Sequence, residues 1–86
     1  MNVRVPSNLA DYTNDARVVE ARGGTLGEAL EDLDRRYPGI RFRIVSEQDR
    51  IRRHIKIFVN QDQARDLGAS LAPDDEIMIV AALSGG

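Results

Sequence analysis

The segment from Thr25 to Tyr37 constrains the fold of this chain more than any other part of it. Its apolar residues recur at helical spacing and form a single stripe made of Leu26, Ala29, Leu30, Leu33 and Tyr37. Thr25 followed by Glu28 is a capping box that predicts the start of a helix, and Pro38-Gly39 predicts its end. A chain of 86 residues has room for one domain. In a domain of this size, a single amphipathic helix can bury its apolar stripe only by packing against a sheet.

The polar side of the same helix carries two oppositely charged pairs at i,i+4 spacing. These are Glu31 with Arg35 and Asp32 with Arg36. Pairs in this order stabilise a helix, so we expect both to form on its solvent-exposed side.

Alternation of apolar and polar residues predicts the strands that the helix would cover. We expect strands at residues 2–6, 17–22, 54–59 and 76–80, separated by polar turns at 7–15, 60–62 and 73–75. The first two strands should form a hairpin. Residues 40–53 fit either a short strand or an irregular connection, because Ile40, Phe42 and Ile44 alternate with arginines and a polar stretch follows. The predicted fold class is therefore α+β, with the helix packed across one face of the sheet.

Composition excludes several classes of function. The chain has no cysteine, which rules out a disulfide scaffold, a thiolate metal site and a cysteine nucleophile. Its single histidine, His54, stands at a predicted strand start without a second ligand or a nucleophile, so we expect it to be exposed. Asp74, Asp75 and Glu76 are expected to be a solvated strand end, since EF-hand spacing is missing. We predict no catalytic residue, no metal site and no bound cofactor.

Charge and hydropathy indicate the compartment and the kinds of partner. Residues 35–56 carry eight basic residues against two acidic ones, although the net charge of the chain is −2. A nucleic-acid-binding surface usually makes the whole domain basic, so we expect no nucleic-acid partner. No stretch has the length and apolar character of a signal peptide or a membrane span. We therefore expect a cytoplasmic protein without a membrane partner.

The last six residues, 81–86, form a segment with little to anchor it and end in Gly85-Gly86. We expect a domain at residues 1–80 followed by a flexible tail at 81–86. A glycine pair can enter a narrow channel on a partner, because no Cβ obstructs the backbone. Such a channel would receive the α-carboxylate of Gly86, which reacts only after activation, usually by transfer onto ATP.

These features together resemble the ubiquitin-like β-grasp sulfur carriers, the ThiS/MoaD family of thiamine, molybdopterin and cysteine biosynthesis. The resemblance extends over nearly the whole chain, from the capped helix to Val59-Asn60, Asp75-Glu76-Ile77 and Gly85-Gly86. The segment 25–40 is most similar to the carriers that supply cysteine synthesis. The resemblance implies a β-grasp fold, with a mixed sheet of four to five strands and one main helix across one face.

The resemblance also implies a function that depends on the end of the chain. An E1-like activating enzyme would use ATP to adenylate Gly86, which would become a thiocarboxylate, and Gly85 would give partners access to it. The chain would then be a co-substrate that donates sulfur to a biosynthetic enzyme. Three alternatives stay open: the small subunit of molybdopterin synthase, a protein modifier conjugated to lysines, and a β-grasp interaction domain with an incidental Gly-Gly.

Strand alternation predicts a docking surface as well. If Ile57, Ile77 and Ile79 face the helix, then the outward positions between and beside them belong to Phe58, Met78 and Val80. Should the two strands be neighbours, these side chains would form an apolar patch on the open face of the sheet. We expect this patch, together with Leu83, to dock the activating enzyme and the sulfur acceptor.

Overall fold

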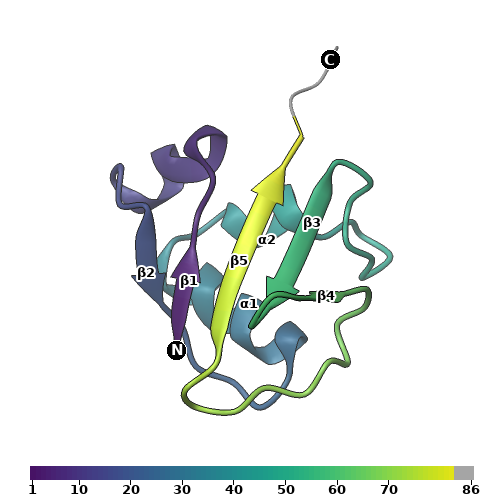
Figure 1. Ribbon diagram of the computed structural model, residues 1–86. Coiled ribbons are helices and arrows are strands. Elements are labelled where there is room, and N and C mark those ends of the chain that lie inside the picture. Colours follow the sequence, from purple (N-terminus) through teal and green to yellow (C-terminus); the bar gives the residue numbers. More distant parts are fainter. Residues whose placement is uncertain (83–86) are drawn as a thin grey trace.

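The computed structural model describes residues 1–82, and five strands form one mixed sheet in this part of the chain (Figure 1). The strands are β1 (Asn2–Arg4), β2 (Val18–Glu20), β3 (Ile55–Val59), β4 (Asp62–Ala64) and β5 (Glu76–Ala81). Their order across the sheet is β2-β1-β5-β3-β4. β1 and β5 are parallel, and the other neighbouring pairs are antiparallel. The last strand along the chain therefore lies in the centre of the sheet.

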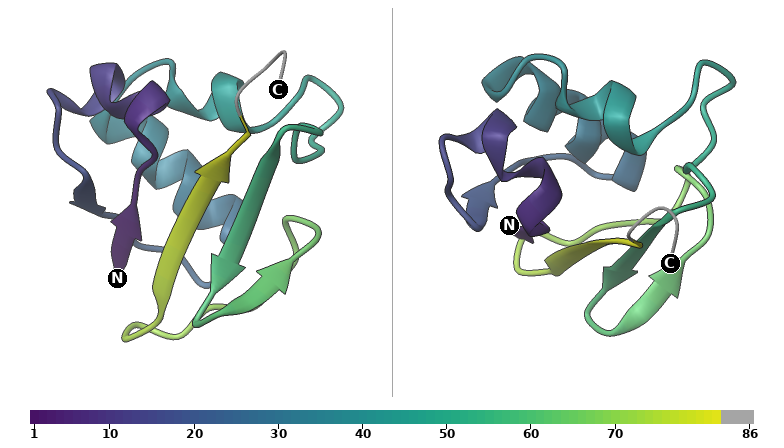
Figure 2. Two further views of the ribbon diagram at one scale, coloured as in Figure 1. Left: turned by 45° about the horizontal axis from the view of Figure 1, so that its top comes forward. Right: turned by 90° about the horizontal axis from the view of Figure 1, so that it is seen from above.

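The helices lie on one side of this sheet. They are α1 (Leu26–Arg36), α2 (Ile40–Ile44) and the 3₁₀ helix η1 (Ser7–Thr13). The view from above in Figure 2 shows these helices in one layer and the strands in another, with the second face of the sheet left open by the described residues. This arrangement confirms the predicted α+β class and the helix across one face.

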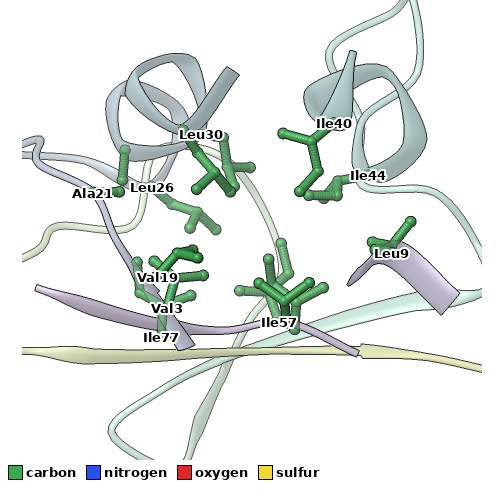
Figure 3. Close-up of a cluster of buried hydrophobic side chains, with 14 of the residues drawn as sticks. Val3, Leu9, Val19, Ala21, Leu26, Leu30, Ile40, Ile44, Ile57 and Ile77 are labelled. Atoms are coloured by element: carbon green, nitrogen blue, oxygen red, sulfur yellow. The ribbon is translucent and has the colours of Figure 1, made fainter. Parts of the chain in front are cut away.

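Side chains from both layers form one hydrophobic core (Figure 3). The strands contribute Val3, Val19, Ile55, Ile57, Ile77 and Ile79, and α1 contributes Leu26, Ala29, Leu30 and Leu33. All of these residues are at most 7% exposed. The predicted apolar stripe is confirmed, with Tyr37 half-buried at its end.

The beginning of α1 shows why the helix starts where it does. The backbone N–H of Glu28 donates to Oγ1 of Thr25 at 3.2 Å. In return, Oε1 of Glu28 accepts from the backbone N–H of Gly24 at 2.8 Å. The predicted capping box is present, with its return hydrogen bond made one residue before the cap. These bonds satisfy backbone donors that the first turn of a helix leaves without partners.

Asp32 organises the polar side of α1. Its carboxylate pairs with Arg35 and with Arg36, each at 2.9 Å, and also accepts from the backbone N–H of Arg22 at 2.9 Å. The hydrogen bond from Arg35, supported by those from Arg22 and Arg36, lowers the pKa of Asp32 from 3.8 to about 2. The Asp32–Arg36 pair is as predicted, whereas Arg35 contacts Asp32 in place of Glu31. Asp32 thereby ties α1 to the segment that follows β2.

Residues 7–15, predicted as a polar turn, contain the helix η1. Leu9 and Ala10 are 4% and 6% exposed, so part of this connection is core. Thr13 is also buried and its hydroxyl donates to the backbone carbonyl of Ala16 at 2.7 Å. The prediction was wrong because two neighbouring apolar residues in a polar segment are too few to produce a periodic pattern.

Residues 40–44 form the helix α2, so the prediction of a strand or an irregular connection was wrong for these five residues, whereas residues 46–53 are an irregular connection as expected. Ile40 and Ile44 are both 0% exposed, whereas Phe42 is 56% exposed. Residues four apart share one side of a helix, so these two isoleucines satisfy helical spacing as well as alternation. Asp34 fixes the choice, because its Oδ1 accepts from the backbone N–H groups of Gly39 and Arg41 at 3.1 Å.

A tight turn joins β3 to β4. Asn60 and Gln61 adopt positive φ angles of 50° and 78°, the left-handed region that two-residue hairpin turns of type I′ require. The side chain of Asn60 accepts from the backbone N–H of Glu76 at 2.9 Å and donates to Asp75 at 2.7 Å. The predicted turn is confirmed at residues 60 and 61, whereas Asp62 already begins β4, and Asn60 connects the turn to the start of β5.

Candidate functional site: the open face of the sheet and the end of β5

The register of the strands places five outward positions in one row across the sheet. In order from β2 to β4 these are Val18, Arg4, Met78, Phe58 and Gln63. The residues on either side of Met78 in β5, Ile77 and Ile79, point into the core. The row therefore lies on the face of the sheet opposite the helices.

Phe58, Met78 and Val80 form an apolar group on this face, which we call the open-face patch. Phe58 lies directly opposite Met78 in the β3–β5 pairing. Met78 and Val80 are 40% and 39% exposed, and Phe58 is half-buried. The strands are neighbours and the predicted register is correct, so the structure brings these three predicted residues together.

Two residues that the sequence prediction did not include extend the patch toward β2. Val18 is 49% exposed, and Arg4 lies between it and Met78 in the row. Arg4 also pairs with Glu76 at 3.3 Å, which puts a charged pair beside the apolar residues. The alternation of Val18 with buried Val19 already indicated an outward side chain, but nothing in the sequence showed that β1 lies between β2 and β5.

Val80 is the residue of the open-face patch nearest the point where β5 ends, and Met78 lies three residues before the last residue of the strand. Ala81, the last residue of β5, pairs with Ile55, the first residue of β3. One residue further, the backbone N–H of Ala82 donates to the carbonyl of His54 at 2.8 Å. The ordered strand thus continues past residue 80, where we expected a tail to begin. Leu83, Gly85 and Gly86 lie outside the described residues.

The remaining candidate residues are His54 and the acidic residues at the start of β5. His54 is exposed, as predicted. Asp75 accepts from the backbone N–H of Ala72 at 2.8 Å and from Asn60, and these hydrogen bonds lower its pKa. Within residues 1–82 no three acidic or histidine side chains are grouped as a metal site requires. None of the helices in that range has the length and apolar character of a membrane span.

The strand order, the parallel β1–β5 pair and the helix across one face define a small β-grasp protein of the ubiquitin-like class. Residues 3–86 match the ThiS family, and the chain belongs to this family. The curated relatives include "Sulfur carrier protein CysO" of Mycobacterium tuberculosis, 32% identical over 91 residues that span 100% of this chain and 98% of the relative.

Solved structures agree with this assignment. A chain in the crystal structure of the Amycolatopsis orientalis BexX/CysO complex matches with a TM-score of 0.91 and 32% identity, over 99% of this chain and 98% of that one. SAMP1, small archaeal modifier protein 1, from Haloferax volcanii matches with a TM-score of 0.81 and 27% identity, over 99% and 97%. The β-grasp fold implied by the sequence resemblance is confirmed.

Proposed function

We propose that this chain is a sulfur carrier protein that serves the synthesis of cysteine or a related sulfur metabolite in the cytoplasm. The observation that carries the proposal is the match along the whole chain to sulfur carriers, combined with the terminal Gly85-Gly86. In this role the chain is a co-substrate of other enzymes and not an enzyme itself. It binds no cofactor, and the ATP that it needs is used by its activating enzyme.

The chemistry proceeds at the α-carboxylate of Gly86. An E1-like enzyme transfers the AMP part of ATP onto this carboxylate and releases pyrophosphate. Sulfide then attacks the acyl carbon and displaces AMP, which leaves a thiocarboxylate. The acceptor enzyme takes the sulfur from this group. Gly85 gives access to Gly86, because a residue without Cβ leaves the backbone open on both sides. The lack of cysteine means that no internal thiol competes for the activated carbon.

The open-face patch, extended by Leu83, is the docking surface in this proposal. Met78 and Val80 are each about two-fifths exposed, at 40% and 39%. Val80 is one residue from Ala81, the end of β5, so a partner that contacts it would also be near the residues that follow. Apolar side chains at the centre and charged ones such as Arg4 and Glu76 at the rim are the usual composition of a protein interface.

The test is a labelling experiment that uses the missing cysteines. The purified chain is incubated with ATP, sulfide and a ThiS-family activating enzyme, treated at mildly acidic pH with a thiol-reactive reagent, and mapped by mass spectrometry. We expect a label at Gly86 that depends on ATP. A reaction without ATP and a chain without Gly85-Gly86 are the controls. Mapping is needed because replacing oxygen by sulfur nearly equals the mass change on oxidation of Met1 or Met78.

The labelling experiment, together with an analysis of conjugates in cells and a search for a molybdopterin synthase partner, separates the alternatives. Conjugation to lysines is the second candidate, favoured by the similarity to the small archaeal modifier protein. It predicts an adenylate, no stable thiocarboxylate and a ladder of heavier conjugates in cells. The small subunit of molybdopterin synthase would form the thiocarboxylate but would pair with a molybdopterin synthase large subunit. If several activating enzymes form no adenylate and loss of Gly85-Gly86 changes nothing, the chain is a plain interaction domain.

A further inference from the structure

A second surface, distinct from the open-face patch, lies at the end of the molecule where β5 finishes. It consists of Phe42 and Arg43 from α2 and of Arg50, Arg52 and Arg53 from the segment before β3, and we call it the basic end. Arg43, Arg50 and Arg53 are exposed, and Phe42 is 56% exposed. Figure 2 shows α2 and the start of β3 at the same end of the molecule as the last described residues.

The segment that carries these arginines is held in a defined conformation. Val45 and Ile51 form a β-bridge, and the backbone N–H of Ser46 donates to the carbonyl of Arg50 at 2.8 Å. The backbone N–H of Arg52 donates to the carbonyl of Ile44 at 3.0 Å. The arginines therefore project from a fixed backbone, so a partner that binds them has little backbone to order.

Arg52 and Phe42 form the centre of the basic end. Nε of Arg52 donates to the carbonyl of Phe42 at 2.8 Å, and the guanidinium lies 4.7 Å from the centre of the phenyl ring. This is a cation–π pair with a hydrogen bond that fixes its geometry. A depression of about 230 Å³ beside it is lined by Phe42, Arg43, Arg52 and His54. Aromatic and arginine side chains in such a setting are the types most often found at the centre of interfaces.

Most of the positive charge at the basic end is not neutralised within residues 1–82. Arg41 pairs with Asp49 at 3.2 Å. In the same part of the chain no carboxylate lies within ion-pair distance of Arg43, Arg52 or Arg53. Charges that the fold leaves without partners are available to an oppositely charged molecule.

The opposite end of the sheet carries the opposite charge. Glu20, Asp74 and Glu76 are exposed there and line one depression together with Met1. β5 therefore runs from an acidic end to a basic end, where Ala82 is bonded to His54. A partner with an acidic surface would attract the basic end and repel the acidic end. Such a field orients the chain during encounter, with the end of β5 foremost.

We infer that the basic end docks an acidic surface on the activating enzyme that adenylates Gly86. The inference rests on the proposed function for the identity of that protein, and adds a second contact region on the other side of the β5 terminus from the open-face patch. A protein is favoured over nucleic acid because the chain as a whole carries a net charge of −2. A long polyanion would also meet the acidic end.

The first test measures binding of model polyanions by nuclear magnetic resonance. The ¹⁵N-labelled chain is titrated with a decaglutamate peptide and, separately, with decathymidylate DNA. We expect saturable shifts at residues 41–54 with the peptide, weakened about tenfold by Arg43→Glu combined with Arg53→Glu. Neither side chain makes a hydrogen bond within residues 1–82, so the fold should tolerate both changes. Arg65→Glu combined with Arg22→Glu is the matched control, because it changes the net charge equally at exposed positions elsewhere.

The outcomes decide between the alternatives. Equal weakening by the control pair would mean that only net charge matters, and absence of shifts at 41–54 would mean that the surface does not bind acidic groups. Either result overturns the inference. Tighter binding of the DNA than of the peptide would overturn it in favour of a nucleic-acid surface.

A second test uses the activating enzyme that labels Gly86 in the wild-type chain. We expect Arg43→Glu with Arg53→Glu to raise KM about tenfold and to leave kcat unchanged, with the effect shrinking as salt is added. An unchanged KM with normal labelling of Gly86 would overturn the docking inference and leave the sulfur-carrier proposal intact. Failure to label the wild-type chain with any activating enzyme would instead contradict the proposed function, while the peptide titration would still report on the surface.

Discussion

The two sides of β5 differ sharply in their exposure to solvent, although both consist of apolar residues. Ile77 and Ile79 face the helices and are 0% and 2% exposed, whereas Met78 and Val80 face away and are 40% and 39% exposed. All four are apolar, so composition cannot distinguish them, and only the alternation of the strand does. The inner side holds the fold together. The outer side is only partly buried, so its side chains are accessible to a partner.

The largest effect that this comparison predicts is loss of stability from Ile77→Ala. Removing a fully buried side chain from a close-packed core costs about 2–5 kcal/mol, a large part of the stability of a small domain. The free energy of unfolding, measured in urea, should fall by that amount. Met78→Ala is the neighbouring control and should change it by less than about 1 kcal/mol. Equal losses at both positions would contradict the division of β5 into two sides.

Gly23 and Gly24 test how closely the start of α1 packs against the segment that precedes it. A Cβ at Gly23 would lie 2.5 Å from the backbone nitrogen of Ala29 in the first turns of α1, whereas a Cβ at Gly24 would approach only Oε1 of Glu28 at 3.4 Å. Gly23→Ala should therefore displace the helix and cost about 1–3 kcal/mol. Gly24→Ala should be nearly neutral, since 3.4 Å is an ordinary van der Waals distance and the hydrogen bond from Gly24 to Glu28 can stay in place. Thermal unfolding of both variants, followed by circular dichroism, checks the difference.

On the outer side, charge at the patch should impair partner binding more than it impairs folding. Phe58→Asp and Met78→Asp should each raise the KM for adenylation by about tenfold, because a carboxylate would be buried in an apolar contact. Gln63→Asp, in the same row on β4, is the matched control and should leave KM unchanged. Circular dichroism shows whether each variant is folded. Normal folding together with normal adenylation in both patch variants would eliminate the proposed docking surface.

The smallest effect concerns the polar side of α1 and depends on pH. The pKa of Asp32 is lowered from 3.8 to about 2 in the folded chain, mainly by its hydrogen bond from Arg35. The ionised carboxylate therefore stabilises the fold above pH 3.8, and this contribution is lost as the pH falls toward about 2. With screening by solvent we expect about 1 kcal/mol. Asp32→Asn should remove this part of the pH dependence of unfolding in urea, and an unchanged profile would contradict it.

Patterns that repeat over many residues predicted the main elements of the fold. The capped helix and the alternation of β3 and β5 repeat over enough residues to be recognised, whereas β1 and β2, of three residues each, are shorter than the predicted strands. The short helices α2 and η1 could not be predicted in this way. Ile40 and Ile44 fit a helix and a strand equally well, and the contacts of Asp34 with the backbone of Gly39 and Arg41 favour the helix. Local sequence carries little information where tertiary contacts select the conformation.

The candidate site was predicted in part for a similar reason. Phe58 and Met78 could be placed on the outward side because alternation assigns each residue to a face. Arg4 and Val18 were missed because their position depends on the order of the strands, which brings β1 between β2 and β5. The basic end was visible as a run of charges, but its position beside the end of β5 follows only from the folded chain.

The central position of β5 has a mechanical consequence. One edge of the strand is bonded to β1 from Asn2 to Arg4, and the other edge is bonded to β3 from Ile55 to Val59. A pull on the residues after Ala81 acts along the strand, so it loads both ladders in shear instead of opening hydrogen bonds one at a time. A partner can therefore bind and pull on the segment that follows β5 without unfolding the sheet, because β5 is bonded along both edges.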